Sequence, residues 1–164
     1  MGRWRPPQPK SAPYITPAGF AALQKEQDAL WVRRRDVVAA LSAAAAEGDR
    51  SENAEYIYRK KELAGIDRRI RYLQKRVPEL QVVDAAPRTD RIFFGACVAL
   101  LRDGTEELSV QIVGADEIDG RLGRISVDSP LARSLLGKGV AAEVTLTVEG
   151  EPHQYSVLDI SCPD

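Results

Sequence analysis

The sequence predicts an α+β protein in which a long helical hairpin precedes a small sheet domain. Two long segments with helical apolar spacing flank a short acidic stretch, residues 48–56. After about residue 90 the spacing changes to the alternation typical of strands. We therefore divide the chain into a Pro-rich flexible leader (1–13), an antiparallel coiled-coil hairpin with an acidic tip (14–84) and a sheet domain (85–164).

The first helix is predicted to begin at Pro17 and to end near Glu47. Thr16 is a suitable N-cap, and proline is favoured at the first helical position. A helix of this length measures about 45 Å at 1.5 Å per residue. Polar Gln27 and Arg34 interrupt its apolar face. The apolar residues on that face are Phe20, Leu23, Leu30, Val37, Leu41 and Ala44.

The second helix is predicted to begin near Ser51 and to end near Pro78, which cannot continue a helix. Its apolar residues alternate spacings of three and four, as in a coiled-coil seam. They are Leu63, Ile66, Ile70, Leu73 and Val77. Because only a few residues join the two helices, we expect them to pack antiparallel.

Basic residues lie nearly opposite this seam. Residues 59–76 carry a net charge of +6. We call four of these residues the basic stripe: Lys61, Arg68, Arg71 and Lys75. A solvated helix face explains such a pattern, and so does a surface that attracts a polyanion. No base-reading motif accompanies it.

The C-terminal segment is predicted to form an antiparallel sheet with one short helix. We expect a turn at residues 102–105 and a short helix at 131–136, which Ser129 and Pro130 begin and Gly137 ends. The expected strands are 93–101, one with Leu108, Val110 and Ile112 facing inward, 124–127, 143–148 and 155–160.

Two interpretations fit the acidic stretch. In the first, Gly48 ends the incoming helix and Asp49 caps the outgoing one, with Glu52 three residues later as in a capping box. In the second, Asp49 and Glu52 stand at the end of the hairpin and share one divalent cation. The two interpretations are compatible.

Composition argues against a membrane-spanning protein and against a cysteine-based metal or redox site. No apolar run approaches the roughly 18 residues that a membrane span requires. The two cysteines, Cys97 and Cys162, lack metal or redox spacing, which suits the reducing cytoplasm. The net charge is −1, divided as +3 over residues 1–13, +2 over 14–84 and −6 over 85–164. This asymmetry suggests that the two halves meet different partners.

Several motifs resemble the bacterial transcript-cleavage factors of the Gre family. They are Gly-Asp-Arg-Ser-Glu-Asn-Ala-Glu-Tyr at 48–56, Tyr-Arg-Lys-Lys at 58–61, Ile-Asp-Arg-Arg-Ile-Arg-Tyr-Leu at 66–73, Gly-x-Asp-Glu-Ile at 114–118 and Ile-Ser-Val-Asp-Ser-Pro-Leu-Ala-Arg at 125–133. Phe-Phe-Gly-Ala at 93–96 is more similar to the GreB branch than to the GreA branch. The resemblance covers residues 14 to 160.

The resemblance implies an FKBP-like C-terminal domain that binds bacterial RNA polymerase at the rim of its secondary channel. The coiled coil would then reach the active site and stimulate cleavage of the 3′ end of backtracked RNA by the polymerase itself. The chain would be an activator rather than an enzyme, and we expect a monomer.

The resemblance also assigns residues. Asp49 and Glu52 would hold the second catalytic Mg²⁺ jointly with the polymerase and help to orient the attacking water, and Ser51 and Asn53 would support the tip. The polymerase-binding residues would be Asp128, Ser129, Pro130 and Leu131. The basic stripe would face the extruded RNA.

The sequence departs from the Gre family pattern in two places, and two alternative functions are retained. The Pro-rich leader is extra, and Ala141-Ala142 replace an expected Gly-Asp. One alternative is a homologue that occupies the channel and inhibits or regulates polymerase without promoting cleavage. The other is a peptidyl-prolyl isomerase, for which Phe93, Phe94 and Tyr155 supply few aromatics.

Overall fold

The computed structural model describes residues 6–47, 53–84 and 90–163, which divide into two compact units. The helical unit is Ala18–Leu80, and the sheet unit joins Met1–Pro17 to Gln81–Asp164. Residues 14–17 and 81–84, assigned above to the hairpin, thus fall in the sheet unit. None of the helices in the described ranges is long and apolar enough to cross a membrane.

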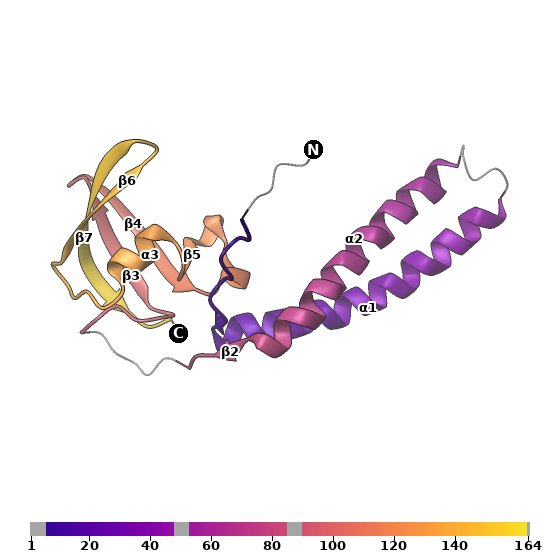
Figure 1. Cartoon of the computed structure of the whole chain (residues 1–164), viewed down its shortest axis with the longest axis horizontal. Coiled ribbons are helices and arrows are strands. Elements are labelled where there is room, and N and C mark those ends of the chain that lie inside the picture. Colours follow the sequence, from indigo (N-terminus) through magenta and orange to yellow (C-terminus); the bar gives the residue numbers. More distant parts are fainter. Residues whose placement is uncertain (1–5, 48–52, 85–89, 164) are drawn as a thin grey trace. The chain divides into compact units, whose positions relative to one another are not determined.

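The helical unit is a hairpin of two long helices, α1 (Pro17–Ala46) and α2 (Ala54–Arg76) (Figure 1). The start of α1 and the end of α2 are as predicted. The start of α2 is not, because the extended backbone of Asn53 (φ −84°, ψ 100°) precedes the first helical turn. The N-cap of α2 is therefore Asn53, and the interpretation of Asp49 as its cap is wrong.

Apolar contacts and ion pairs both hold the antiparallel pair together. Val37 of α1 packs in one buried cluster with Ile66 and Ile70 of α2. Arg34 interrupts the apolar face without leaving a charge unpaired, because its Nε lies 2.8 Å from Oδ1 of Asp67. The other buried residues of the two helices are Leu23, Ala44 and Leu73.

The sheet unit contains five strands in the order β5-β4-β3-β7-β6. Their bounds are β3 (Cys97–Arg102), β4 (Glu106–Val113), β5 (Arg124–Ser126), β6 (Glu143–Val148) and β7 (Glu151–Ser161), and the helix α3 (Pro130–Leu135) follows β5. The predicted α+β class is confirmed, but the sheet is mixed rather than wholly antiparallel. Strand β5 pairs parallel with β4, because the chain crosses back between them through residues 114–123.

The turns explain where the strands begin and end. Asp103 and Gly104 both have positive φ (52° and 71°), so β3 turns tightly into β4 as predicted. Glu149 and Gly150 (φ 51° and 83°) make an equivalent turn, and β7 therefore starts earlier than predicted. At the other end of the sheet, Gly95 (φ 89°) delays β3 until Cys97.

The core of the sheet unit lies between the sheet and α3. Val110 and Ile112 face inward as predicted, and Leu108 packs against the same core at partial burial. Leu135 of α3 is fully buried. The other core residues include Ile92, Ala96, Val98, Leu100, Ala132, Tyr155, Val157 and Ile160.

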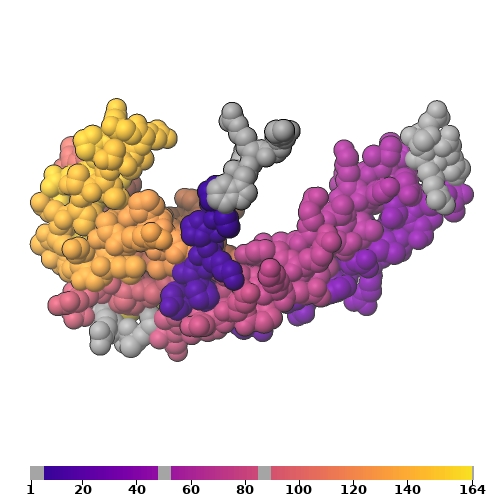
Figure 2. All heavy atoms as spheres, viewed as in Figure 1, coloured from indigo at the N-terminus to yellow at the C-terminus, as the bar shows by residue number. Residues whose placement is uncertain are grey.

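A short N-terminal segment completes this unit. Strand β1 (Tyr14–Ile15) pairs parallel with β2 (Gln81–Val82), and Ile15 is fully buried. The segment passes so close to Gly114 that a Cβ there would meet the Tyr14 carbonyl oxygen at 2.0 Å. In Figure 2 its indigo spheres lie against the orange spheres of the sheet unit.

Candidate functional site

Asn53 joins the two helix ends that flank the acidic tip. Its Oδ1 accepts a hydrogen bond from the Tyr56 N–H at 3.1 Å, which caps α2. Its Nδ2 donates to the Ala44 carbonyl oxygen at 2.8 Å, in the last turn of α1. One side chain thereby binds a backbone group at each helix end and ties the two ends together.

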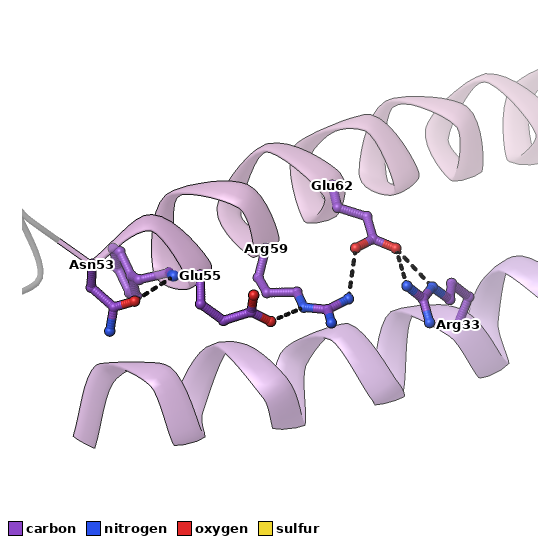
Figure 3. A network of polar contacts seen from close by, with 6 residues as sticks. Arg33, Asn53, Glu55, Arg59 and Glu62 are labelled. Carbon is purple, nitrogen blue, oxygen red and sulfur yellow. Dashed lines mark hydrogen bonds and ion pairs between the residues drawn. The ribbon is translucent and has the colours of Figure 1, made fainter. Parts of the chain in front are cut away.

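Further along the hairpin, two glutamates are engaged by arginines (Figure 3). Arg59 Nε lies 2.8 Å from Glu55 Oε1, and Arg59 Nη1 lies 3.1 Å from Glu62 Oε2. Arg33 of α1 donates from Nε to Glu62 Oε1 at 2.7 Å. The hydrogen bond from Arg33 lowers the pKa of Glu62, and the hydrogen bond to Glu55 raises the pKa of Arg59.

This network engages one acidic residue close to the tip. Glu55 is committed to Arg59, one turn further along α2. The predicted metal ligands Asp49 and Glu52, together with Ser51, lie outside the described residues. Within the ranges that the structure covers, no group of three or more His, Cys, Asp or Glu side chains could hold a metal ion.

The basic stripe is exposed along the whole length of α2. All four of its side chains are exposed, and the structure gives none of them an ion pair with another described residue. The neighbouring Arg69 differs, because it holds Glu26 of α1 through Nε at 2.6 Å and Nη2 at 3.0 Å. The basic residues of α2 thus include some that bind α1, such as Arg69, and others that face solvent, such as the basic stripe.

The predicted polymerase-binding segment forms the start of α3. The hydroxyl of Ser129 accepts a hydrogen bond from the Ala132 N–H, and Pro130 stands exposed at the first helical position. Leu131 packs against the core at partial burial. Asp128 accepts a hydrogen bond from the Ala12 N–H at 2.9 Å, so it also secures the N-terminal segment.

The same segment is secured a second time beside the start of α1. The carboxylate of Glu117 accepts hydrogen bonds from the Thr16 N–H (3.1 Å), the Thr16 hydroxyl and the Gly114 N–H (2.8 Å). The sequence motif containing Glu117 was noted, but its partner lies 101 residues away. No pattern of spacing could have paired them.

Comparison with known proteins decides the family. The family profile described as "Transcription elongation factor, N-terminal" matches residues 13–82. The profile described as "Transcription elongation factor, GreA/GreB, C-term" matches residues 87–162. The chain belongs to the GreA/GreB family. It is a transcription elongation factor of the Gre type.

Relatives within this family agree with the GreB-like motifs. The transcription elongation factor GreB of Xanthomonas axonopodis pv. citri is 55% identical over 98% of this chain and 97% of its own length. GreB of Pseudomonas aeruginosa is 48% identical over 99% and 98% respectively. Among solved structures, Gfh1 of Thermus aquaticus is 24% identical, with a TM-score of 0.44 over 93% of this chain and 99% of that one.

The aromatic residues weighed for an isomerase pocket have other roles in this Gre-family chain. Tyr155 belongs to the buried core at 5% exposure. The ring of Phe94 meets Tyr14 edge to face, with 6.1 Å between ring centroids. Phe93 packs against the core. These contacts disfavour a proline-binding pocket built from the three rings.

Proposed function

We propose that this chain enters the secondary channel of bacterial RNA polymerase and stimulates the polymerase to cleave the 3′ end of backtracked RNA. The chain is then an activator of the polymerase endonuclease rather than an enzyme, and it acts as a monomer on arrested complexes. Its family membership supports elongation as the process, and its acidic tip supports cleavage as the step.

The observation that carries the proposal is the construction around the tip. Helix α1 has 30 residues, about 45 Å at 1.5 Å per residue, so the hairpin is long enough to reach a recessed active site. Asn53 holds the two helix ends together, and Arg59 occupies Glu55. Asp49 and Glu52 lie in the sequence between these two helix ends, and we assign them to the metal ion that the chain shares with its partner.

The donor set fits Mg²⁺. This ion is commonly held by one or two carboxylates together with substrate phosphates and water. Asp49 and Glu52 would supply those carboxylates, and the polymerase and the RNA would supply the rest. A bound Mg²⁺ polarises a phosphoryl oxygen and makes water a stronger nucleophile. Two carboxylates alone hold such an ion weakly, so activity depends on the polymerase.

The sheet unit supplies the proposed docking surface. Ser129 and Pro130 fix the start of α3, which exposes Pro130 and holds Leu131 partly against the core. A rigid, partly apolar surface of this kind suits a protein partner. We therefore assign polymerase binding to residues 128–131 and catalysis support to the hairpin.

The test replaces both proposed ligands by amides. Asp49→Asn with Glu52→Gln should abolish stimulated RNA shortening in a stalled polymerase complex, because amides keep the shape and lose the charge that Mg²⁺ needs. Polymerase affinity should change by no more than a few-fold. The matched control is Glu55→Gln, which neutralises an acid that Arg59 already occupies and should retain cleavage.

The outcomes separate the alternatives. Full cleavage by the double variant would refute the metal role of Asp49 and Glu52. If the unmodified protein binds polymerase and shortens no RNA, the chain is instead a channel-occupying regulator. Direct measurement of proline isomerisation on a peptide tests the remaining enzyme hypothesis.

A further inference from the structure

The stretch before Ala12 is exposed and makes no polar contact with the rest of the described chain. We call this stretch, residues 6–11, the proline arm; its sequence is Pro-Pro-Gln-Pro-Lys-Ser. All six of its residues are exposed, and the structure gives none of them a hydrogen bond or an ion pair with another described residue. Neither the fold nor the proposed function gives the proline arm a role.

The residues that follow the proline arm are firmly held in the sheet unit. The Gln81 N–H donates to the Pro13 carbonyl oxygen at 2.7 Å, and the Val83 N–H donates to the Ile15 carbonyl oxygen at 2.9 Å. The side chain of Ile15 is fully buried. The proline arm therefore starts from a fixed point of the sheet unit.

That fixed point adjoins the proposed docking residues. The Ala12 N–H donates to Asp128 Oδ2 at 2.9 Å. Asp128 is itself held, because its N–H donates to Ser126 Oγ at 3.1 Å. It directly precedes Ser129, which caps α3, and the exposed Pro130. The carboxylate of Asp128 therefore holds the base of the proline arm next to the docking residues.

The composition of the proline arm suits a protein partner. Three of its six residues are proline, which fixes φ and favours the extended polyproline II conformation. A segment that is already extended loses little conformational freedom when it binds. Lys10 forms no ion pair with another described residue, although residues 85–164 carry a net charge of −6. Its positive charge is therefore available to a partner.

We propose that the proline arm is part of the surface that docks on RNA polymerase, and that Asp128 contributes to docking by positioning this arm. In the docked state the arm lies extended along an acidic, partly apolar surface of the polymerase, next to the place that receives residues 129–131. The inference rests on the proposed function for the identity of the partner. It makes Asp128 a positioning residue rather than a direct contact.

Continuity with the docking residues favours polymerase over a nucleic acid as the occupant. Six residues in the polyproline II conformation span about 19 Å, so a protein that covers Pro130 is within reach of the proline arm. The prolines offer apolar surface that a protein can cover. Lys10 is the only charged residue of the arm, and one lysine supplies little of the phosphate pairing on which affinity for nucleic acids depends.

The first experiment measures the affinity of the full chain for RNA polymerase that is free of nucleic acid. The arm variant replaces residues 6–11 by Gly-Ser-Gly-Ser-Gly-Ser, which keeps the length and removes the prolines and the charge. It should bind at least about fivefold more weakly. Its melting temperature should be unchanged, because the arm makes no polar contact with the described chain. The matched control, Gln8→Ser, keeps every proline and Lys10 and should bind as the original does.

A double-mutant cycle tests the role of Asp128. Asp128→Ala removes the acceptor of the Ala12 N–H and should weaken polymerase binding, whereas Asp128→Asn keeps an oxygen that accepts this hydrogen bond and should restore it. Combining Asp128→Ala with the arm variant should cost no more affinity than the arm variant alone, because both changes remove the same contact. Additive losses would show that Asp128 contacts polymerase directly and would refute its positioning role.

The remaining outcomes separate this inference from the proposed function. If the arm variant binds polymerase as tightly as the original and stimulates cleavage equally, the proposed function stands and the inference is wrong. If the original binds polymerase through its arm and shortens no RNA in a stalled complex, the arm assignment stands and the proposed cleavage function fails. If the arm variant loses affinity only for free RNA or DNA, the arm contacts nucleic acid and the inference is overturned.

Discussion

Ala141 shows what one substitution does to a backbone. The resemblance predicted glycine at this position, and the backbone there has φ of 71°, in the left-handed region that alanine adopts at a cost. Two backbone hydrogen bonds between this turn and Val157 stabilise it. The Ala141 N–H donates to the Val157 carbonyl oxygen, and the Val157 N–H donates to the Ala142 carbonyl oxygen, both at 2.9 Å.

We expect Ala141→Gly to stabilise the protein by about 0.5–1 kcal/mol, since relief of the left-handed strain exceeds the added freedom of the unfolded chain. Thermal or urea unfolding measures the change. The matched control is Ala142→Gly, which has no positive φ to relieve and loses a side chain packed against the core. It should destabilise the protein, and equal effects of the two changes would contradict the explanation.

Asn53 offers a second test with a single side chain. Asn53→Asp keeps the oxygen that caps α2 and loses the amide that donates to Ala44. We expect a loss of about 1 kcal/mol of unfolding free energy and a larger proportional loss of cleavage stimulation, because the tip is no longer tied to α1.

Asn53→Ala removes both hydrogen bonds of this side chain and should cost about 1 kcal/mol more in stability than Asn53→Asp. Comparing the two variants separates the cap from the cross-link. Unchanged cleavage by Asn53→Asp would show that the hydrogen bond to Ala44 has no part in tip function.

At the scale of elements, cap residues and apolar spacing predicted the helices, whose bounds depend on short-range interactions. Thr16-Pro17, Ser129-Pro130 and the apolar spacing of both long helices gave the correct helices, since caps and periodicity act within a few residues. The strand Glu143–Val148 was also predicted with its observed bounds. The motifs at the tip and at α3 led to the family, which the comparisons confirm.

Contacts between distant residues escaped prediction. Strands β1 and β2 have two residues each, too few to show any alternation. The parallel pairing of β5 depends on how the chain crosses back, which no pattern within the strand records. The cap of α2 was misplaced because Asp49 and Asn53 are both good cap residues, and Asn53 is selected by its additional bond to Ala44.

At the scale of the whole molecule, the two units differ in composition as well as in fold. The hairpin segment, 14–84, carries a net charge of +2 and the C-terminal segment, 85–164, a net charge of −6. Basic residues gather on the outer face of α2, whereas the sheet unit presents α3 and its proline. This division agrees with the proposed separation of catalysis support from polymerase docking.

The sheet unit contains residues from both sides of the hairpin, so a stable fragment of it must include both segments. Residues 85–164 alone lack the fully buried Ile15 and strand β2, so their folded state should be weaker by at least about 2 kcal/mol than that of residues 6–17 joined to 81–164 by a short Gly-Ser linker. Circular dichroism melting of both fragments measures this, with an expected difference of roughly 10 °C.

Polymerase binding by the joined fragment and by the isolated hairpin tests where docking resides. The joined fragment should bind with an affinity close to that of the full chain, whereas the isolated hairpin, residues 18–80, should bind poorly. Equal melting temperatures for the two sheet fragments would show that the N-terminal segment adds no stability. Tight binding by the isolated hairpin would contradict the assignment of docking to residues 128–131.

The N-terminal segment also imposes an order on folding during synthesis. Ala12 and Thr16 leave the ribosome early, yet their partners Asp128 and Glu117 follow 116 and 101 residues later. The hairpin needs only contacts made within residues 18–80, and local contacts form fast. The hydrogen bonds of Ala12 and Thr16 can therefore form only after the whole hairpin and most of the sheet unit have been translated, so one of the first segments to leave the ribosome is among the last to be secured.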